Sequence, residues 1–146
     1  EAIGATFKDE TGEAKPVIMG SYGIGPARVM GTIVDLWADE KGIVWPKAVS
    51  PFLVHLVALN TDDPEILDWA NGVYTSLQKQ GFTVLYDDRD ARAGEKFADS
   101  DLLGLPYRVV VSKKTKESGR FEVVNRATGE TSHLDEAALY NFLQHE

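Results

Sequence analysis

Two stretches of the sequence carry residue types that could do chemistry. The first, residues 19–28, reads Met-Gly-Ser-Tyr-Gly-Ile-Gly-Pro-Ala-Arg, so that three glycines precede an arginine. Glycine lets a backbone approach a ligand closely because it has no Cβ, and Arg28 offers a planar cation that stacks on a base or binds a phosphate. The spacing is neither the dinucleotide-binding fingerprint nor a P-loop. The residues alone leave two interpretations open, a structural turn and a nucleotide site.

The second stretch, residues 87–99, mixes carboxylates with basic side chains. It follows the carboxyl end of an expected strand, where open α/β sheets tend to bind their ligands. Carboxylates accept hydrogen bonds from the ring N–H and amino groups of guanine, whereas Arg and Lys donate to its O6 and N7 acceptors and to phosphates. A mixed site can therefore select guanines in a single-stranded RNA loop. The alternative is local: Asp87 caps a turn, and Asp88 with Arg89 forms an ion pair worth under about 1 kcal/mol.

The other polar candidates have plainer interpretations. Glu122 and Arg126 lie on or beside a later expected strand, where they could pair with each other. A group of lysines is expected in a solvated loop, from which it could also reach phosphate; these are Lys113, Lys114 and Lys116. The three histidines are widely spaced and the chain has no cysteine, so we expect no metal site. His55 interrupts an apolar strand, and we expect it to be a hydrogen-bonded core residue.

The elements that position the first stretch are short. Residues 6–12 and 15–19 predict two strands that form a hairpin. Pro26 suits the first turn of a helix, and apolar residues at helical spacing predict that this helix continues until Gly42 stops it. Two dipeptides, Trp-Pro at 45–46 and Ser-Pro at 50–51, bracket a connector that predicts a domain boundary.

The elements that position the second stretch alternate between strands and helices. Residues 52–59 predict a buried strand, and Asp63 with Pro64 predicts the start of a helix that Gly81 ends. Further strands are expected over residues 82–86, 107–111, 121–125 and around Glu130, with helices over residues 97–103 and 134–144. We expect Phe97 and Leu102 to lie in the core. The pattern predicts an α/β fold with a mixed five-stranded sheet and helices on its faces.

Charge and composition exclude several classes of function. The chain has 146 residues and a net charge of −8, so its overall field does not attract nucleic acid. Residues 87–130 contain nine Lys/Arg and nine Asp/Glu, which places the whole excess of negative charge elsewhere and allows a locally basic face. No apolar run approaches the roughly 20 residues that span a membrane, and the N-terminus does not have the pattern of a signal peptide.

The first stretch resembles motif 3 of the class II aminoacyl-tRNA synthetases, in the form found in bacterial-type prolyl-tRNA synthetases. The resemblance implies that residues 1–45 are a strand-hairpin and helix remnant of the antiparallel catalytic domain. It further implies that Gly23 and Gly25 line a pocket for ATP and amino acid, and that Arg28 packs on ATP. The family often has Val-Ser where this chain has Pro26 and Ala27, positions that we expect to face away from the ligand.

Three further blocks resemble the same family in the same order, so the resemblance covers nearly the whole chain. They are the connector near residues 42–54, the stretch from 87 to 106, and residues 121–130. They imply that residues 46–146 form a class II anticodon-binding domain. The residues implied to contact the anticodon loop are Asp88, Arg89, Arg92, Lys96, Asp99, Glu122 and Arg126.

The resemblance also implies what the protein does and what it lacks. The parent enzyme would be a cytoplasmic homodimer that attaches proline to its tRNA with ATP and Mg as substrate. This chain has no candidate for motif 1 or motif 2, so we expect it to be inactive alone, to bind no cofactor, membrane or DNA, and to bind the anticodon stem-loop of the proline tRNA. The proline anticodon carries two guanines, which suits a mixed acidic and basic site.

Two rival hypotheses belong to other functional classes. In one, the chain is a small nucleotide-binding module whose working site is residues 20–28, and saturable ATP binding at micromolar levels would favour it. In the other, the α/β domain is a protein-interaction module, and a defined protein partner without tRNA binding would favour that. The extent of the family resemblance favours anticodon binding over both.

Overall fold

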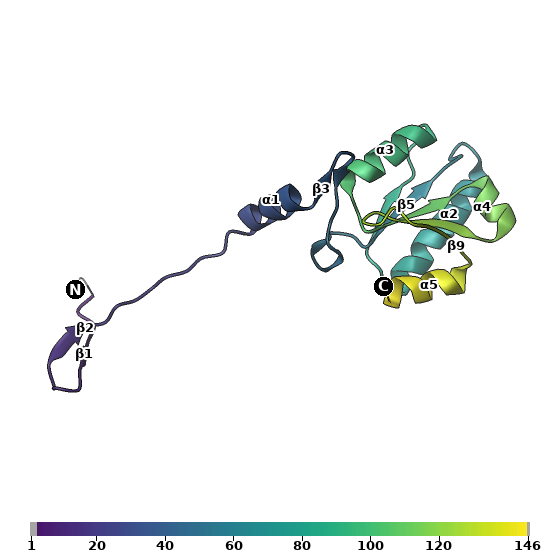
Figure 1. Cartoon of the computed structure of the whole chain (residues 1–146). Coiled ribbons are helices and arrows are strands. Elements are labelled where there is room, and N and C mark those ends of the chain that lie inside the picture. The colour runs from purple at the N-terminus through teal and green to yellow at the C-terminus, as the bar shows by residue number, and fades with distance from the viewer. Residues whose placement is uncertain (1–2, 146) are drawn as a thin grey trace.

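A five-stranded mixed sheet organises the C-terminal two thirds of the chain (Figure 1). The computed structural model describes residues 3–145, and the strand order is β6-β5-β7-β8-β9. Strand β5 (Val54–Ala58) pairs in parallel with β6 (Val84–Asp87) and with β7 (Tyr107–Val111), whereas β8 (Phe121–Asn125) and β9 (Thr131–Leu134) add antiparallel pairs. The predicted mixed five-stranded α/β sheet is confirmed.

One face of the sheet forms the hydrophobic core with helices α2 (Pro64–Lys79) and α5 (Glu136–His145). Strand side chains alternate between the two faces, and this face receives Val54, Leu56 and Ala58 of β5, all fully buried. Helix α2 begins as predicted, because the Asp63 carboxylate accepts a hydrogen bond from the Glu65 amide at 3.0 Å. Helices α2 and α5 lie together on this side of the sheet in Figure 1.

Helix α3 (Ala93–Leu103) lies alone on the opposite face of the sheet (Figure 1). It ends at Gly104, as expected from a helix over residues 97–103, and this glycine has the left-handed conformation. The prediction that Leu102 lies in the core is wrong, because this side chain is 59% exposed. The buried positions of α3 are Lys96 and Ser100, one helical turn apart, so that a lysine occupies the place expected of an apolar residue.

A short helix, α4 (Lys113–Ser118), joins β7 to β8 where a loop was expected. It begins with a capping box, in which the Ser112 side chain accepts from the Thr115 amide and the Thr115 side chain accepts from the Ser112 amide. Threonine replaces the usual Glu or Gln of this motif, and the lysine-rich sequence gave no apolar periodicity. The expectation of a loop is therefore corrected.

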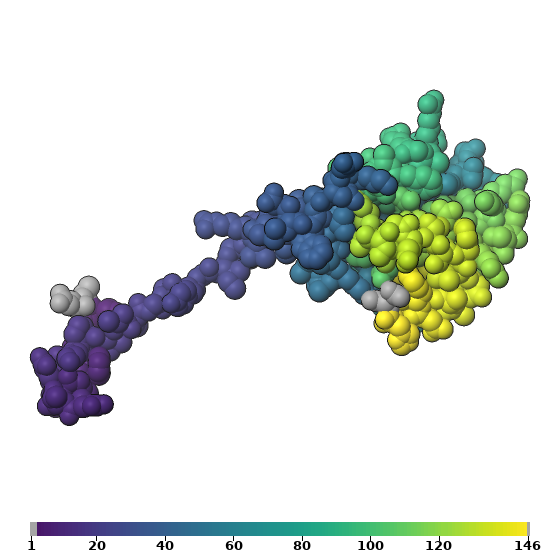
Figure 2. Space-filling view, viewed as in Figure 1, coloured from purple at the N-terminus to yellow at the C-terminus, as the bar shows by residue number. Residues whose placement is uncertain are grey.

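The N-terminal third contains small elements with little burial. Strands β1 (Thr6–Lys8) and β2 (Ala14–Pro16) form the predicted hairpin, with β2 ending three residues before Met19. An extended segment then leads to α1 (Pro26–Leu36), none of whose residues is buried. Figures 1 and 2 show the β1–β2 hairpin at the far end of this segment from the α/β domain.

A second hairpin connects α1 to the sheet and corrects the predicted end of that helix. Helix α1 ends at Leu36 rather than near Gly42, and residues 38–43 form β3 (Ala38–Asp39) and β4 (Gly42–Ile43). The Asp39 carboxylate accepts from the amides of Lys41 and Gly42, which closes the turn between the two strands. A 3₁₀ turn, η1 (Lys47–Val49), follows.

The β3–β4 hairpin packs directly against the C-terminal end of α3. A Cβ on Gly104 would lie 1.7 Å from the Ile43 carbonyl oxygen, and one on Gly42 would lie 2.5 Å from Leu102 Cα. The Trp45 amide donates to the Gly104 carbonyl at 3.0 Å.

Residues 1, 2 and 146 of the two expected units lie outside the described range. Between residues 3 and 145, no helix combines the length and apolarity needed to cross a membrane.

Candidate functional site

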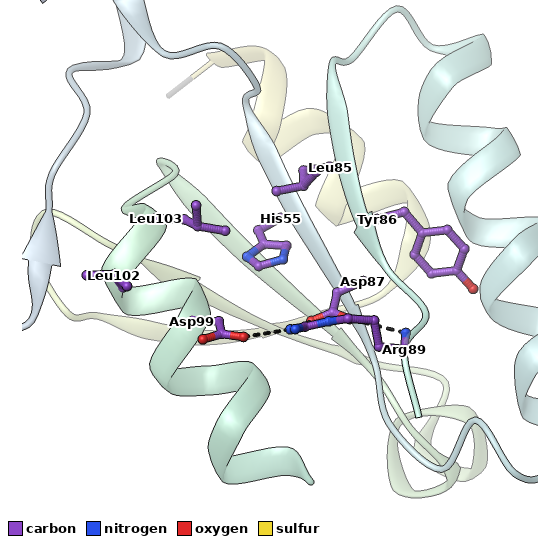
Figure 3. A pocket seen from close by; sticks show the side chains of 8 residues that line it. All are labelled: His55, Leu85, Tyr86, Asp87, Arg89, Asp99, Leu102 and Leu103. Carbon is purple, nitrogen blue, oxygen red and sulfur yellow. Dashed lines mark hydrogen bonds and ion pairs between the residues drawn. The ribbon is translucent and has the colours of Figure 1, made fainter. Parts of the chain in front are cut away.

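Arg89 is fixed at the carboxyl edge of the parallel strands by two carboxylates (Figure 3). Its Nε and one Nη donate to Asp87, the last residue of β6, at 2.9 and 2.8 Å. The same Nη donates to Asp99 of α3 at 2.7 Å. The local ion pair of Arg89 is thus made with Asp87 and not with Asp88. Three hydrogen bonds hold the guanidinium in one plane between a strand and a helix.

The electrostatics of this cluster favour the charged forms of Asp87 and Arg89. Arg89 hydrogen bonds hold the pKa of the buried Asp87 carboxyl below its usual range, and the two carboxylates raise the pKa of Arg89. The Arg89 side chain is still 52% exposed. A fixed planar cation with an open surface can stack on a base or bind a phosphate.

A pocket of about 330 Å³ opens beside this cluster, between α3 and the sheet. Figure 3 shows Asp87, Arg89 and Asp99 along one side of it and the leucines Leu85 and Leu103 along the other, with His55 between them. Such a volume lies at the lower end of the range for small-molecule sites. The pocket is therefore an apolar slot with a charged rim.

His55, the second residue of β5, lines this pocket and is buried as expected, but its hydrogen bonding differs from that expected of a core histidine. It is only 2% exposed, but its Nδ1 has no hydrogen-bond partner within residues 3–145. Burial lowers the pKa of its imidazole, so the ring is neutral near pH 7. The only sequence signal for this position is a lone polar residue in an apolar strand, a pattern that is also typical of a structural histidine.

The strand register places Glu122 on the same face and at the same level as Asp87. Asp87 pairs with Val57, Val57 with Val110, and Val110 with Glu122, in one row across four strands. At about 4.8 Å per strand, the row separates the two carboxylates by about 14 Å. Glu122 is half-buried, and it borders the site without joining the Arg89 cluster.

Asp88 and Arg92 are the most accessible of the expected residues. Both are exposed on the loop between β6 and α3, and no hydrogen bond or ion pair of their side chains occurs within the described part of the chain. Arg92 occupies the N-cap position of α3. They can meet a ligand without breaking an internal contact.

Lys96 is placed where a surface ligand does not reach it. The residue is fully buried, and its Nζ donates to the Ala58 carbonyl at 2.6 Å and lies 3.8 Å from the Asp87 carboxylate. Desolvation lowers the pKa of its ammonium. The structure therefore gives Lys96 the role of joining α3 to the ends of β5 and β6, which positions the loop between them.

Arg126 lies at the opposite edge of the sheet from Arg89. It follows β8, whose last residue Asn125 pairs with Tyr107 at the start of β7. Its guanidinium donates twice to the Asp39 carboxylate at 2.7 Å and once to the Asp101 carbonyl at 3.1 Å. Arg126 therefore holds the β3–β4 hairpin, it does not pair with Glu122, and the expected anticodon residues do not form one cluster.

Arg108 is a polar residue of the same face that was not predicted from the sequence. It lies on β7 in register with His55, donates to the Asp101 carboxylate at 2.8 Å, and stacks its guanidinium 4.7 Å from the centre of the Phe97 ring. It binds α3 to the sheet. The only sequence signal was its place between apolar strand neighbours.

The glycine-rich stretch forms a separate, shallow hollow at the start of α1. Gly23, Gly25 and Arg28 line it together with apolar residues of the helix, and its volume is about 370 Å³. All three residues are exposed, and Gly25 is the N-cap of α1. The structure thus brings the expected nucleotide-binding residues together.

Among the described residues, no group of three His, Asp or Glu side chains is arranged to hold a metal ion.

Comparisons with known proteins show which family the chain belongs to. Residues 53–146 match the family described as Anticodon binding domain. The chain is 50% identical over 143 residues to a proline–tRNA ligase of Bacillus cytotoxicus, a match that covers 98% of the chain and 25% of that relative. It is 50% identical over 139 residues to a proline–tRNA ligase of Exiguobacterium sibiricum, covering 95% of the chain and 24% of the relative. The chain thus spans about a quarter of the length of these curated relatives.

Proposed function

Because this chain belongs to the anticodon-binding domain family, we propose that its α/β domain reads the anticodon loop of the proline tRNA at the edge of the sheet formed by Arg89 and its neighbours. A tRNA is the partner that the family implies. The observation that supports this site most directly is the Arg89 guanidinium, held by Asp87 and Asp99 and half exposed.

The composition of the edge suits a single-stranded RNA loop. Asp88 and Arg92 are exposed and free to bind, so that one accepts from a guanine edge and the other donates to a guanine or a phosphate. Arg89 presents a flat surface on which an unstacked base can lie. Selectivity then comes from the alternation of acidic and basic groups, since the chain as a whole is negatively charged.

The rest of the parent protein enters as part of the same proposal. The parent attaches proline to its tRNA in the cytoplasm, as a homodimer with ATP and Mg as substrate, and Gly23, Gly25 and Arg28 contribute to its nucleotide site. Within this chain the hollow at α1 is open on one side, with all three residues exposed. We therefore propose that the chain alone binds ATP weakly or not at all and catalyses no transfer.

The direct test is a titration of the chain with two labelled anticodon stem-loops at moderate salt. One loop carries the two proline guanines, and in the other both are changed. We expect at least about tenfold tighter binding to the guanine loop, because one good bidentate base contact is worth about 1–3 kcal/mol. Equal affinity for both loops would contradict guanine reading by this domain.

Arg92→Ala tests the site within the same titration without disturbing the fold. Its exposed side chain makes no hydrogen bond or ion pair among residues 3–145, so we expect a nearly unchanged melting temperature and a loss of affinity of about fivefold or more. Lys79→Ala, at the end of α2 on the other face, removes one positive charge as a control. A similar loss in both variants would indicate non-specific attraction to phosphate.

A further inference from the structure

Two unsatisfied features of the fold meet in the pocket between α3 and the sheet. Nδ1 of His55 is buried without a hydrogen-bond partner in the described chain, although buried polar groups are nearly always paired. Leu102 and Leu103, which also line the pocket, are 59% and 43% exposed. The fold thus leaves a polar group unpaired and apolar side chains exposed at one place. A single ligand could both hydrogen-bond to the polar group and cover the apolar side chains.

The shape and chemistry of the pocket select a flat, partly polar occupant. Leucines from β6 and α3 form apolar walls, the imidazole of His55 lies between them, and the fixed guanidinium of Arg89 lies at the rim (Figure 3). Apolar walls and a planar cation favour an aromatic ring system, whereas the imidazole requires a hydrogen-bonding group on that ring. The buried ring is neutral near pH 7 because burial lowers its pKa, so it can donate at one nitrogen and accept at the other.

We propose that this pocket receives one unstacked nucleobase of the bound RNA loop and that His55 hydrogen-bonds to the edge of that base. The inference rests on the proposed anticodon function and adds to it a specificity-determining residue on the sheet, behind the surface cluster. Arg108 pairs with His55 in the register and donates to Asp101 of α3, so the strand and the helix on either side of the pocket are held together. Arg89 at the rim and His55 inside the pocket then act on the same base, Arg89 by stacking and His55 by hydrogen bonding.

The test combines nitrogen-15 resonances of the His55 ring with a substitution series in the full chain. The probes are the anticodon stem-loop with two guanines and, separately, guanosine and cytidine monophosphates at millimolar concentration. We expect the loop to shift the His55 ring resonances and His55→Phe, which keeps the ring volume, to weaken loop binding about tenfold. His145→Phe, on α5 at the other face, should change neither. His55→Gln, which restores a polar group, should recover part of the affinity.

The outcomes separate this inference from the anticodon proposal. If the loop binds but leaves the His55 resonances and the His55→Phe affinity unchanged, the base-in-pocket inference is wrong and the anticodon function stands. If the loop does not bind but a monophosphate shifts the His55 resonances, the pocket is a nucleobase site and the anticodon proposal fails. If neither probe acts, both are wrong. The resonance measurement uses the unmodified chain, so it decides even where a variant fails to fold.

Discussion

Helices α1 and α2 share several sequence signals but lie in different surroundings. Each has a proline in its first turn and apolar residues at helical spacing. Helix α2 buries Ile66, Ala70, Val73 and Leu77 against the sheet, whereas α1 has no buried residue. The local signals of α2 are stronger, because Asp63 caps its first turn whereas Gly25 gives α1 no side-chain cap, but only α2 also packs against the sheet.

The apolar side of α1 is not covered by another element of the described chain. Val29, Met30 and Ile33 line an open apolar groove of about 620 Å³ that continues onto Trp45 and Pro51. No residue of α1 is buried, so this apolar side stays uncovered within residues 3–145. The comparison teaches that residues 53–145 carry their own core and residues 3–36 do not.

The largest expected effect is the contrast between two leucine-to-alanine variants. Leu56 on β5 is fully buried, and Leu36 at the end of α1 is 71% exposed. Leu56→Ala should lower the free energy of unfolding by about 2–5 kcal/mol, because it removes core contacts and leaves a cavity. Leu36→Ala should change it by no more than about 0.5 kcal/mol. Urea unfolding monitored by circular dichroism measures both, and a comparable loss in Leu36→Ala would show that α1 shares the core.

The β3–β4 hairpin lies between the two regions, and a glycine pair tests how firmly it is attached. Gly104 and Gly119 both end helices in the left-handed conformation, with φ of 68° and 66°. A Cβ meets the Ile43 carbonyl at 1.7 Å in the first case and nothing within 4 Å in the second. Both alanine variants carry the same backbone strain, so their difference isolates the packing of the hairpin.

We expect Gly104→Ala to be about 1–3 kcal/mol more destabilising than Gly119→Ala, because the hairpin must move to admit the methyl group. Amide hydrogen exchange should show lost protection at Trp45, whose amide donates to Gly104, and no change in β5. Equal destabilisation by the two variants would mean that the hairpin separates from α3 at little cost. It would then belong with the exposed N-terminal region rather than with the sheet.

Much of the α/β domain could be predicted from sequence because its signals are local and agree with one another. The helix start at Asp63 and Pro64, the helix end at Gly104 and the strand at residues 107–111 all match the structure. The wrong predictions concern positions where contacts between residues far apart in the sequence determine the structure. The turn that Asp39 closes is also held by Arg126, 87 residues away, so helical periodicity in the sequence predicted an overlong α1.

The candidate site was predictable by position but not by role. The stretch after β6 was identified because strand ends at a sheet edge are exposed to ligands, and Arg89 lies there. Lys96 and Arg126 were expected to contact the anticodon loop because of the family resemblance, but each makes an internal contact with its charged group instead. Such contacts join residues that are far apart in the sequence, so only the folded structure reveals them.

The smallest expected effect compares the response of two aspartates to acid. Arg89 holds the pKa of Asp87 below its usual value, and Lys15 lowers the pKa of Asp9 in the β1–β2 hairpin to about 2. A carboxyl whose pKa is lower in the folded state stabilises the fold above its unfolded pKa, near 3.9, and loses that contribution as pH falls through the folded pKa. Asp87→Asn should cost about 1 kcal/mol near neutral pH and flatten the loss of stability below about pH 4.

Asp9→Asn should leave the unfolding of the α/β domain unchanged at every pH, because the β1–β2 hairpin does not contribute to its core. Urea midpoints measured from pH 7 to pH 3 decide the matter, and an acid response altered by Asp9→Asn would mean that the two regions unfold as one unit.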